Sequence, residues 1–227
     1  MTADPLRIAL VGGTGDLGSG LAFQLAKSGF DVVIGSRSVD RAEAIAKALL
    51  AELPKASISA ADNVSAAEGA DVVMMTVPYA SHDATLETIR ENVQGKIFVD
   101  TTVPLVPPKV MRVQLPPDGS VARRAQEVLG ANVRVVSAFQ NIAAAHLRDD
   151  RLSDVTCDVL VCGNDPAARD SIIEIAEAIG LKAWHAGPID NSVVAEALTS
   201  VLIFLNKRYG IDGAGIRIVG NTRADHP

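Results

Sequence analysis

The chain has few of the side chains from which many catalytic centres are built. Among its 227 residues are two cysteines and four histidines, and the histidines lack the spacing of metal ligands. Cys157 and Cys162 lie in one apolar run, where their odd spacing places them on opposite faces of a strand. We therefore expect no metal site, no disulfide and two buried, inert thiols.

Side chains for acid–base or covalent catalysis are also missing. A short-chain dehydrogenase needs a lysine four residues after its tyrosine, but Tyr79 is followed at that spacing by Asp83. Tyr209 is followed by Gly213, so this class is excluded. The lysine that a 6-phosphogluconate-type dehydrogenase needs inside its long helix is absent, because Lys207 falls in the last turn, where it complements the helix dipole. With no Ser-His-Asp or Cys-His arrangement, we expect no catalytic side-chain acid, base or nucleophile.

The chain lacks an excess of basic charge and a recognisable targeting segment. Its net charge of -6 argues against a nucleic acid or an anionic membrane as partner. We see no basic region followed by an apolar one at the N-terminus, and no apolar run of bilayer length. We therefore expect a cytoplasmic protein without membrane contact, with 48% apolar residues to build a sizeable core.

A glycine-rich turn between a strand and a helix is the most informative feature that is present. The run RIALVGGTGDLGSG, residues 7–20, places Gly13, Gly15 and Gly18 in a G-x-G-x-x-G pattern after an apolar strand. Such glycines allow a tight turn, close approach to a pyrophosphate and close packing of helix on strand. N–H groups at the start of the helix then hold the phosphates.

The end of the second strand indicates which dinucleotide binds. NAD-binding domains usually carry an acid there for the ribose hydroxyls, but this chain reads Ser36, Arg37 and, one helical turn on, Arg41. Arginine holds a phosphate dianion with charge-assisted, often bidentate hydrogen bonds. The pattern therefore predicts NADP, although the two arginines could instead decorate a solvated helix start.

Apolar runs alternate with helical patterns along the chain, which predicts an α/β fold of the Rossmann type, a doubly wound and mainly parallel sheet. We place a domain boundary near residue 142, with an NADP-binding domain at 1–142 and a smaller C-terminal α/β domain at 143–227 that closes the substrate cleft. The expected strands are 7–11, 31–34, 57–60, 71–77, 96–101, 133–139, 154–163 and 181–186. The expected helices are 16–28, 39–52, 63–69, 81–92, 120–129, 165–178 and 191–208.

Three motifs follow strands whose carboxyl ends should share one edge of the sheet, where ligands of such folds bind. They are TVPY at 76–79, VDTTVP at 99–104 and SAFQNI at 137–142. Val77, Pro78 and Tyr79 would form a flat wall against the nucleotide, unless these are ordinary strand ends. The proline-rich segment 104–117 would border the cleft.

The order of these motifs resembles the NADP-dependent oxidoreductases of the deazaflavin coenzyme F420. The likeness rests on VGGTGDLGSGLA, VVIGSRSVDRAEA, MMTVPY, VVSAFQNIAA, VLVCGNDP and AGPIDNSVVAEALTSVL. It implies that Thr14, Gly15, Asp16 and Leu17 hold the pyrophosphate, that Ser36, Arg37 and Arg41 hold the 2'-phosphate, and that Val77 and Pro78 hold the nicotinamide half. It also implies that residues 138–144, from Ala138 through Gln140, Asn141 and Ile142 to Ala144, form the floor beneath the deazaflavin.

The chain departs from this family in that floor. Family members carry a His-Thr-Ile-Pro-Ala run where this chain reads QNIAA, so Gln140 offers a donor and an acceptor but no charge. The resemblance implies direct hydride transfer between nicotinamide and deazaflavin, in which the cofactors carry the chemistry. Two other hypotheses stay open: an NADPH-dependent reductase of a small carbonyl or imine, and a non-catalytic NADP sensor.

The segment 191–208 reads as a helix that is apolar on more than one side, and such a helix should be buried on more than one side. We expect a homodimer with this helix near the interface. Packing within one chain is the alternative.

Overall fold

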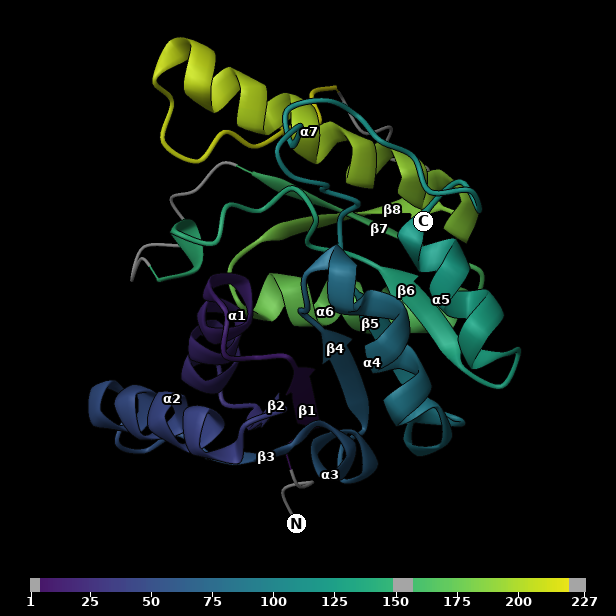
Figure 1. Cartoon of the computed structure of the whole chain (residues 1–227). Helices are drawn as coiled ribbons and strands as arrows, with labels where there is room; N and C mark the ends of the chain where they lie inside the picture. The colour runs from purple at the N-terminus through teal and green to yellow at the C-terminus, as the bar shows by residue number, and fades with distance from the viewer. Residues whose placement is uncertain (1–4, 149–156, 221–227) are drawn as a thin grey trace.

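One sheet runs through the computed structural model, which describes residues 5–148 and 157–220. Within these residues the sheet has eight strands in the order β3-β2-β1-β4-β5-β6-β7-β8. The strands are β1 (Arg7–Val11), β2 (Asp31–Ser36), β3 (Ile58–Asp62), β4 (Val72–Met75), β5 (Ile97–Asp100), β6 (Arg134–Ser137), β7 (Asp158–Gly163) and β8 (Lys182–Gly187). This order, with helices around the sheet (Figure 1), confirms the Rossmann-type α/β prediction.

The helices divide between the two faces of the sheet because successive residues of each strand point to opposite sides. In β1, Ile8 and Leu10 join the apolar cluster under α1, α2 and α6, whereas Ala9 and Val11 join the cluster under α3, α4 and α5. The helices are α1 (Asp16–Lys27), α2 (Val39–Glu52), α3 (Asn63–Glu68), α4 (His82–Ile89), α5 (Val121–Leu129), α6 (Pro166–Ala178) and α7 (Ser192–Tyr209), with 3-10 turns η1 (Tyr79–Ser81), η2 (Arg90–Val93), η3 (His146–Arg148) and η5 (Ile189–Asn191).

The first six strands are parallel, and the direction reverses once. β7 pairs antiparallel with β6 through Ser137 and Cys162, and β8 then runs parallel to β7. This reversal lies beyond residue 142, where we expect the second domain to begin, and the same sheet continues across it. The division into two domains stays a prediction, with residues 154–156 of the seventh expected strand outside the described residues.

Several expected strands are shorter in the structure. β4 stops at Met75, two residues before the expected end, because Pro78 and the turn η1 follow closely. β6 stops at Ser137, since Phe139 adopts a left-handed φ of 70° that no strand continues. The helix expected at 81–92 is split into α4 and the 3-10 turns η1 and η2.

The last helix, α7, packs a polar face inward. Ser192, Glu196 and Ser200 are buried, whereas Val201 and Phe204 are exposed. The segment Ile189–Tyr209 is long and apolar enough to cross a membrane, which corrects our expectation that no run reaches that length. Core helices of water-soluble proteins pass the same test, and Glu196 here receives hydrogen bonds from the start of α5 at 2.7 and 3.1 Å.

The two cysteines are free and buried, and burial raises the pKa of the Cys162 thiol to about 11. Next to Cys157, the first residue of β7 joins β8 to the C-terminal segment. The Asp158 carboxylate accepts hydrogen bonds from Trp184 Nε1 at 2.7 Å and from the Ile218 N–H at 2.8 Å.

Candidate functional site

The glycine turn after β1 has the geometry of a phosphate cradle. Gly12 adopts a left-handed φ of 76°, and its N–H donates to Asn63 Oδ1 at 3.2 Å. A Cβ on Gly18 would lie 2.6 Å from the Gly13 Cα, so only glycine permits this packing of α1 against the turn. A Cβ on Gly15, by contrast, would meet nothing within 4 Å. Gly15 therefore opens a space at the N-terminus of α1, where N–H groups favour an anion.

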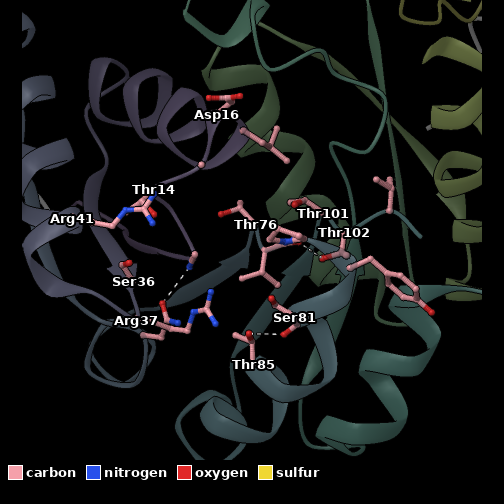
Figure 2. Close-up of a pocket in the computed structure, with 18 of the residues that line it drawn as sticks. Thr14, Asp16, Ser36, Arg37, Arg41, Thr76, Ser81, Thr85, Thr101 and Thr102 are labelled. Atoms are coloured by element: carbon pink, nitrogen blue, oxygen red, sulfur yellow. Dashed lines mark hydrogen bonds between the residues drawn. The ribbon is translucent and has the colours of Figure 1, made fainter. Parts of the chain in front are cut away.

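A cavity of about 680 Å³ lies over this turn at the carboxyl ends of the parallel strands. It falls within the usual size range of small-molecule sites. Its lining joins residues from the turn and from the ends of β2, β3, β4 and β5, several of which are drawn in Figure 2. They are Gly12, Thr14, Gly15, Asp16, Leu17, Ser36, Arg37, Ser38, Arg41, Asn63, Thr76, Val77, Pro78, Tyr79, Ser81, Thr85, Thr101, Thr102, Val103 and Leu105.

One end of the cavity is basic. Arg37 and Arg41 follow β2 with exposed side chains, and Figure 2 shows both on the side of the cavity where Ser36 and Thr14 lie. Ser36 is buried, and its hydroxyl accepts from the Ser38 N–H at 3.2 Å. The Arg37 and Arg41 guanidinium groups therefore give this end of the cavity the charge that a phosphate dianion needs.

The other end of the cavity is built by threonines and a short apolar wall. The hydroxyls of Thr76 and Thr101 donate to the backbone oxygens of Val11 and Met75, at 3.2 and 2.8 Å. Val77 and Pro78 contribute the apolar wall beside them. Burial, and then the charge of Asp83, raises the pKa of the Tyr79 hydroxyl, which keeps it neutral. This end suits an uncharged, flat group better than a phosphate.

The predicted site residues divide into two groups. Ten of the expected cofactor residues line the cavity: Thr14, Gly15, Asp16, Leu17, Ser36, Arg37, Arg41, Val77, Pro78 and Tyr79. Gly13 and Ala138, also expected there, are buried outside its lining. The four residues expected beneath a deazaflavin are also outside it: Gln140, Asn141 and Ile142 are buried, and Ala144 is half-buried.

This buried segment has unusual local features. Phe139 holds a left-handed φ of 70°, a strained conformation that clusters at functional sites. Gln140 Nε2 donates to Asp100 O and to Ser137 Oγ, both at 2.8 Å. Gln140 Oε1 and both polar side-chain atoms of Asn141 are buried with no hydrogen-bond partner among the described residues. Such atoms are costly unless another group satisfies them.

Sequence reasoning missed two parts of the site. Asn63 follows β3 at the same sheet edge and braces the glycine turn, so the rule about strand ends would have found it. A buried pair, His82 and Asp100, lies behind the cavity with 2.8 Å between His82 Nε2 and Asp100 Oδ2. Its members are separated in sequence, and only the fold brings them together. Within the described ranges, no cluster of His, Cys, Asp or Glu could hold a metal ion.

Comparisons with known proteins agree with this geometry. Residues 7–104 match the family model described as NADP oxidoreductase, coenzyme F420-dependent. The F420-dependent NADP reductase of Methanocaldococcus jannaschii is 42% identical, over 94% of this chain and 98% of the relative. The chain belongs to the family of F420-dependent NADP reductases. The family member of the same name from Methanothermobacter marburgensis is 40% identical over 94% of this chain and 98% of its own length.

The family resemblance extends to a solved fold. The crystal structure of a candidate F420-dependent NADP reductase from Arthrobacter sp. FB24 superposes with a TM-score of 0.80 and 29% identity, covering 94% of this chain and 99% of that one. The likeness therefore extends over nearly the whole chain and not only over residues 7–104. The chain is an NADP-dependent oxidoreductase by family.

Proposed function

We propose that the chain transfers a hydride between NADP(H) and coenzyme F420. The observation that carries the proposal is the cavity: a glycine turn open at Gly15, Arg37 and Arg41 at one end, and an apolar wall at the other. This layout matches the phosphates, the 2'-phosphate and the nicotinamide of one extended NADP molecule. The identity to family members over nearly the whole chain supports the same reaction.

The residues of the cavity bind and orient, and the cofactors exchange the hydride. The turn Thr14–Leu17 would hold the pyrophosphate through N–H groups, because the Asp16 side chain carries the wrong charge for it. Val77, Pro78 and Tyr79 would fix the nicotinamide ring. NADPH would then pass a hydride from C4 to C5 of the deazaflavin at a contact of roughly 3 to 3.5 Å, with one proton taken from water.

The second substrate is assigned to the segment from Ala138 to Ala144. Its orphaned Gln140 and Asn141 atoms support a ligand with polar ring edges, because such a ligand would satisfy them. The left-handed Phe139 supports a conformation held in place for function. Since this segment lies outside the cavity lining, Gln140, Asn141, Ile142 and Ala144 stay predictions as deazaflavin contacts.

The assay is direct. Purified protein is mixed with NADPH and oxidised F420, and the loss of deazaflavin absorbance is followed, with NADH as the matched second donor. We expect transfer from NADPH and much slower transfer from NADH. A rate no higher than that without protein would overturn the assignment.

A reductase of a small carbonyl or imine is the second candidate. One observation favours it: this chain has the neutral Gln140 where the family pattern has a histidine. The Gln140 side chain is already hydrogen-bonded to the backbone oxygen of Asp100. A screen of NADPH oxidation with such substrates separates the two. Turnover with an imine and none with F420 would decide for this candidate.

We further propose a cytoplasmic homodimer. Support comes from α7, whose exposed Val194, Val201 and Phe204 leave apolar surface uncovered within one chain. Light scattering at micromolar concentration should give twice the chain mass, and Phe204→Glu should give monomers. Leu6→Glu, at a similarly exposed apolar residue of another surface, is the control. A monomeric wild type would contradict the proposal.

A further inference from the structure

A buried charged pair joins the start of a helix to the end of a strand. His82 is the first residue of α4 and Asp100 is the last residue of β5. Their side chains are 1% exposed or less, and 2.8 Å separates His82 Nε2 from Asp100 Oδ2. Neither residue belongs to the cavity lining. The pair therefore cannot contact a bound nucleotide there, and any effect on it must pass through other residues.

Asp100 connects the cavity to the predicted deazaflavin segment. Its Oδ1 accepts from the Thr102 N–H at 2.9 Å, which fixes the turn that places Thr101 and Thr102 in the lining. Its backbone oxygen accepts from Gln140 Nε2 at 2.8 Å. Asp100 thus fixes both the Thr101–Thr102 rim of the nucleotide cavity and the Gln140 amide that is assigned to the deazaflavin.

The hydrogen bonds of His82 require a charged imidazole. Its Nε2 faces Asp100 Oδ2 at 2.8 Å, and its Nδ1 faces Asp83 Oδ1 at 3.0 Å. A carboxylate offers no hydrogen, so both ring nitrogens can bond only as donors, in the imidazolium form. Burial lowers the pKa of His82, but Asp100 and Asp83 outweigh it and raise the pKa above its usual value.

The charged groups around the pair form a chain to the surface. Asp83 is exposed and lies 3.4 Å from Arg124 of α5, which in turn lies 3.9 Å from Asp118. On the inner side, the charge of Asp100 contributes to raising the pKa of the buried Glu196 of α7. Arg124 shares Asp83 with His82, and the Asp100 carboxylate has His82 as its charged partner.

A buried ion pair is a poor way to gain stability, since apolar side chains of the same volume often serve as well or better. Its place at the ligand-binding edge of the sheet gives it another use. We propose that His82 and Asp100 are positioning residues, which hold the Thr101–Thr102 rim and the Gln140 amide in the one arrangement that brings the two substrates together. This inference rests on the proposed hydride transfer and names residues on which that transfer depends.

The main test compares His82→Gln with Glu87→Gln, an exposed change on the same helix. A displacement of about 1 Å can lower a rate by roughly 100-fold, so we expect His82→Gln to lower kcat at least about tenfold. Since the glycine turn, Arg37 and Arg41, which are assigned to the phosphates, do not depend on the pair, the KM for NADPH and the Kd for NADP+ should change less than about twofold. An unchanged kcat, or a loss confined to the KM for NADPH, would overturn the proposal.

The pH profile separates positioning from a structural role. In the wild type, kcat should fall on the alkaline side as the imidazolium loses its proton and one of its two bonds. Asp83→Asn removes a carboxylate from an exposed position, keeps the buried pair and should move this limb to lower pH. This second variant tests the proposal even if His82→Gln does not fold. A limb at the wild-type pH would count against the proposal.

A binding-independent measurement keeps this inference distinct from the proposed function. The ring nitrogens of His82, observed by NMR in the wild-type protein, should both carry protons at pH 6.5, where an ordinary histidine is about half protonated. A neutral ring at that pH would overturn the pair whether or not F420 is reduced. Conversely, a charged ring in a protein that reduces no F420 would leave the pair standing and overturn the transfer assignment.

Discussion

The glycine turn and the segment from Ala138 to Ala144 lie at the same edge of the sheet and differ in how they meet solvent. Gly15, Arg37 and Arg41 are exposed around an open cavity. Ala138 and Gln140 are buried, and the Gln140 amide is bonded to backbone and to Ser137. The proposed nucleotide site is therefore open to solvent, whereas the segment proposed to contact the deazaflavin holds buried polar atoms without a partner among the described residues.

The largest expected effect comes from changes in the open nucleotide cavity. Arg37→Ala combined with Arg41→Ala removes two charge-assisted contacts to a 2'-phosphate, each worth about 1.5 to 3 kcal/mol. The KM for NADPH should rise roughly 100-fold or more, at about tenfold for each 1.4 kcal/mol. The KM for NADH should stay unchanged, since NADH carries no such phosphate.

Arg90→Ala is the matched control for that measurement, because Arg90 is exposed and lies outside the cavity lining. Equal losses for NADPH and NADH in the double variant would show that the two arginines do not read the 2'-phosphate.

The next effect concerns the stability of the fold and the buried carboxyl group of Glu196. Burial raises the pKa of Glu196 from 4.5 to about 7, against the hydrogen bonds from Val121 and Ala122. Because the folded state keeps this proton longer, its contribution is full below pH 4.5 and is lost as pH rises towards 7, by about 3 kcal/mol. Urea unfolding across this window should show the loss in the wild type.

Glu196→Gln removes the titrating group, so its free energy of unfolding should lack this part of the pH slope. Identical slopes in wild type and Glu196→Gln would show that the buried carboxyl titrates normally.

A smaller effect tests the phosphate cradle alone. Gly15→Ala adds a Cβ that meets no protein atom, at an extended φ of -84°, so the fold should tolerate it. The same Cβ enters the space assigned to the pyrophosphate, and we expect the Kd for NADP+ to rise about tenfold, which is 1.4 kcal/mol. Calorimetric titration measures this, with Gly69→Ala outside the cavity as control. Unchanged binding would move the pyrophosphate away from Gly15.

The last prediction is that the two buried thiols do not react in the native protein. Cys157 Sγ lies 3.5 Å from the Asn141 carbonyl oxygen, and burial raises the pKa of both Cys157 and Cys162. A thiol reagent at pH 8 should therefore label neither cysteine in the native protein and both after denaturation. Native labelling of Cys157 would show that the segment beside Asn141 opens to solvent.

The nucleotide cavity could be predicted from sequence because each of its signals lies within a short stretch of the chain. The bounds of β1 are as expected, and the turn, Ser36, Arg37 and Arg41 follow one another within a few residues of two strands. Gly12 escaped the motif, although its left-handed φ and its bond to Asn63 hold the turn. A fingerprint of spacing does not say which glycine needs the unusual conformation.

The buried polar contacts behind the cavity could not be predicted in detail, because they join residues that lie far apart in the sequence. The pairing of His82 with Asp100, and of Glu196 with the start of α5, has no signature in the sequence near either partner. Helical periodicity indicated an apolar stripe on the last helix but not that its polar face would lie inward. Which face a helix buries depends on what it meets, and that is decided by the whole fold.

The reversal of β7 also gives the protein a local fluorescent reporter. Because β7 runs against β6, its first residue lies beyond the carboxyl ends of the parallel strands, and Asp158 there bonds Trp184. Trp184 is the single tryptophan of the chain. The intrinsic tryptophan fluorescence of the protein therefore comes from one position, and a change in its emission reports on the contact between Asp158 and Trp184 without any label.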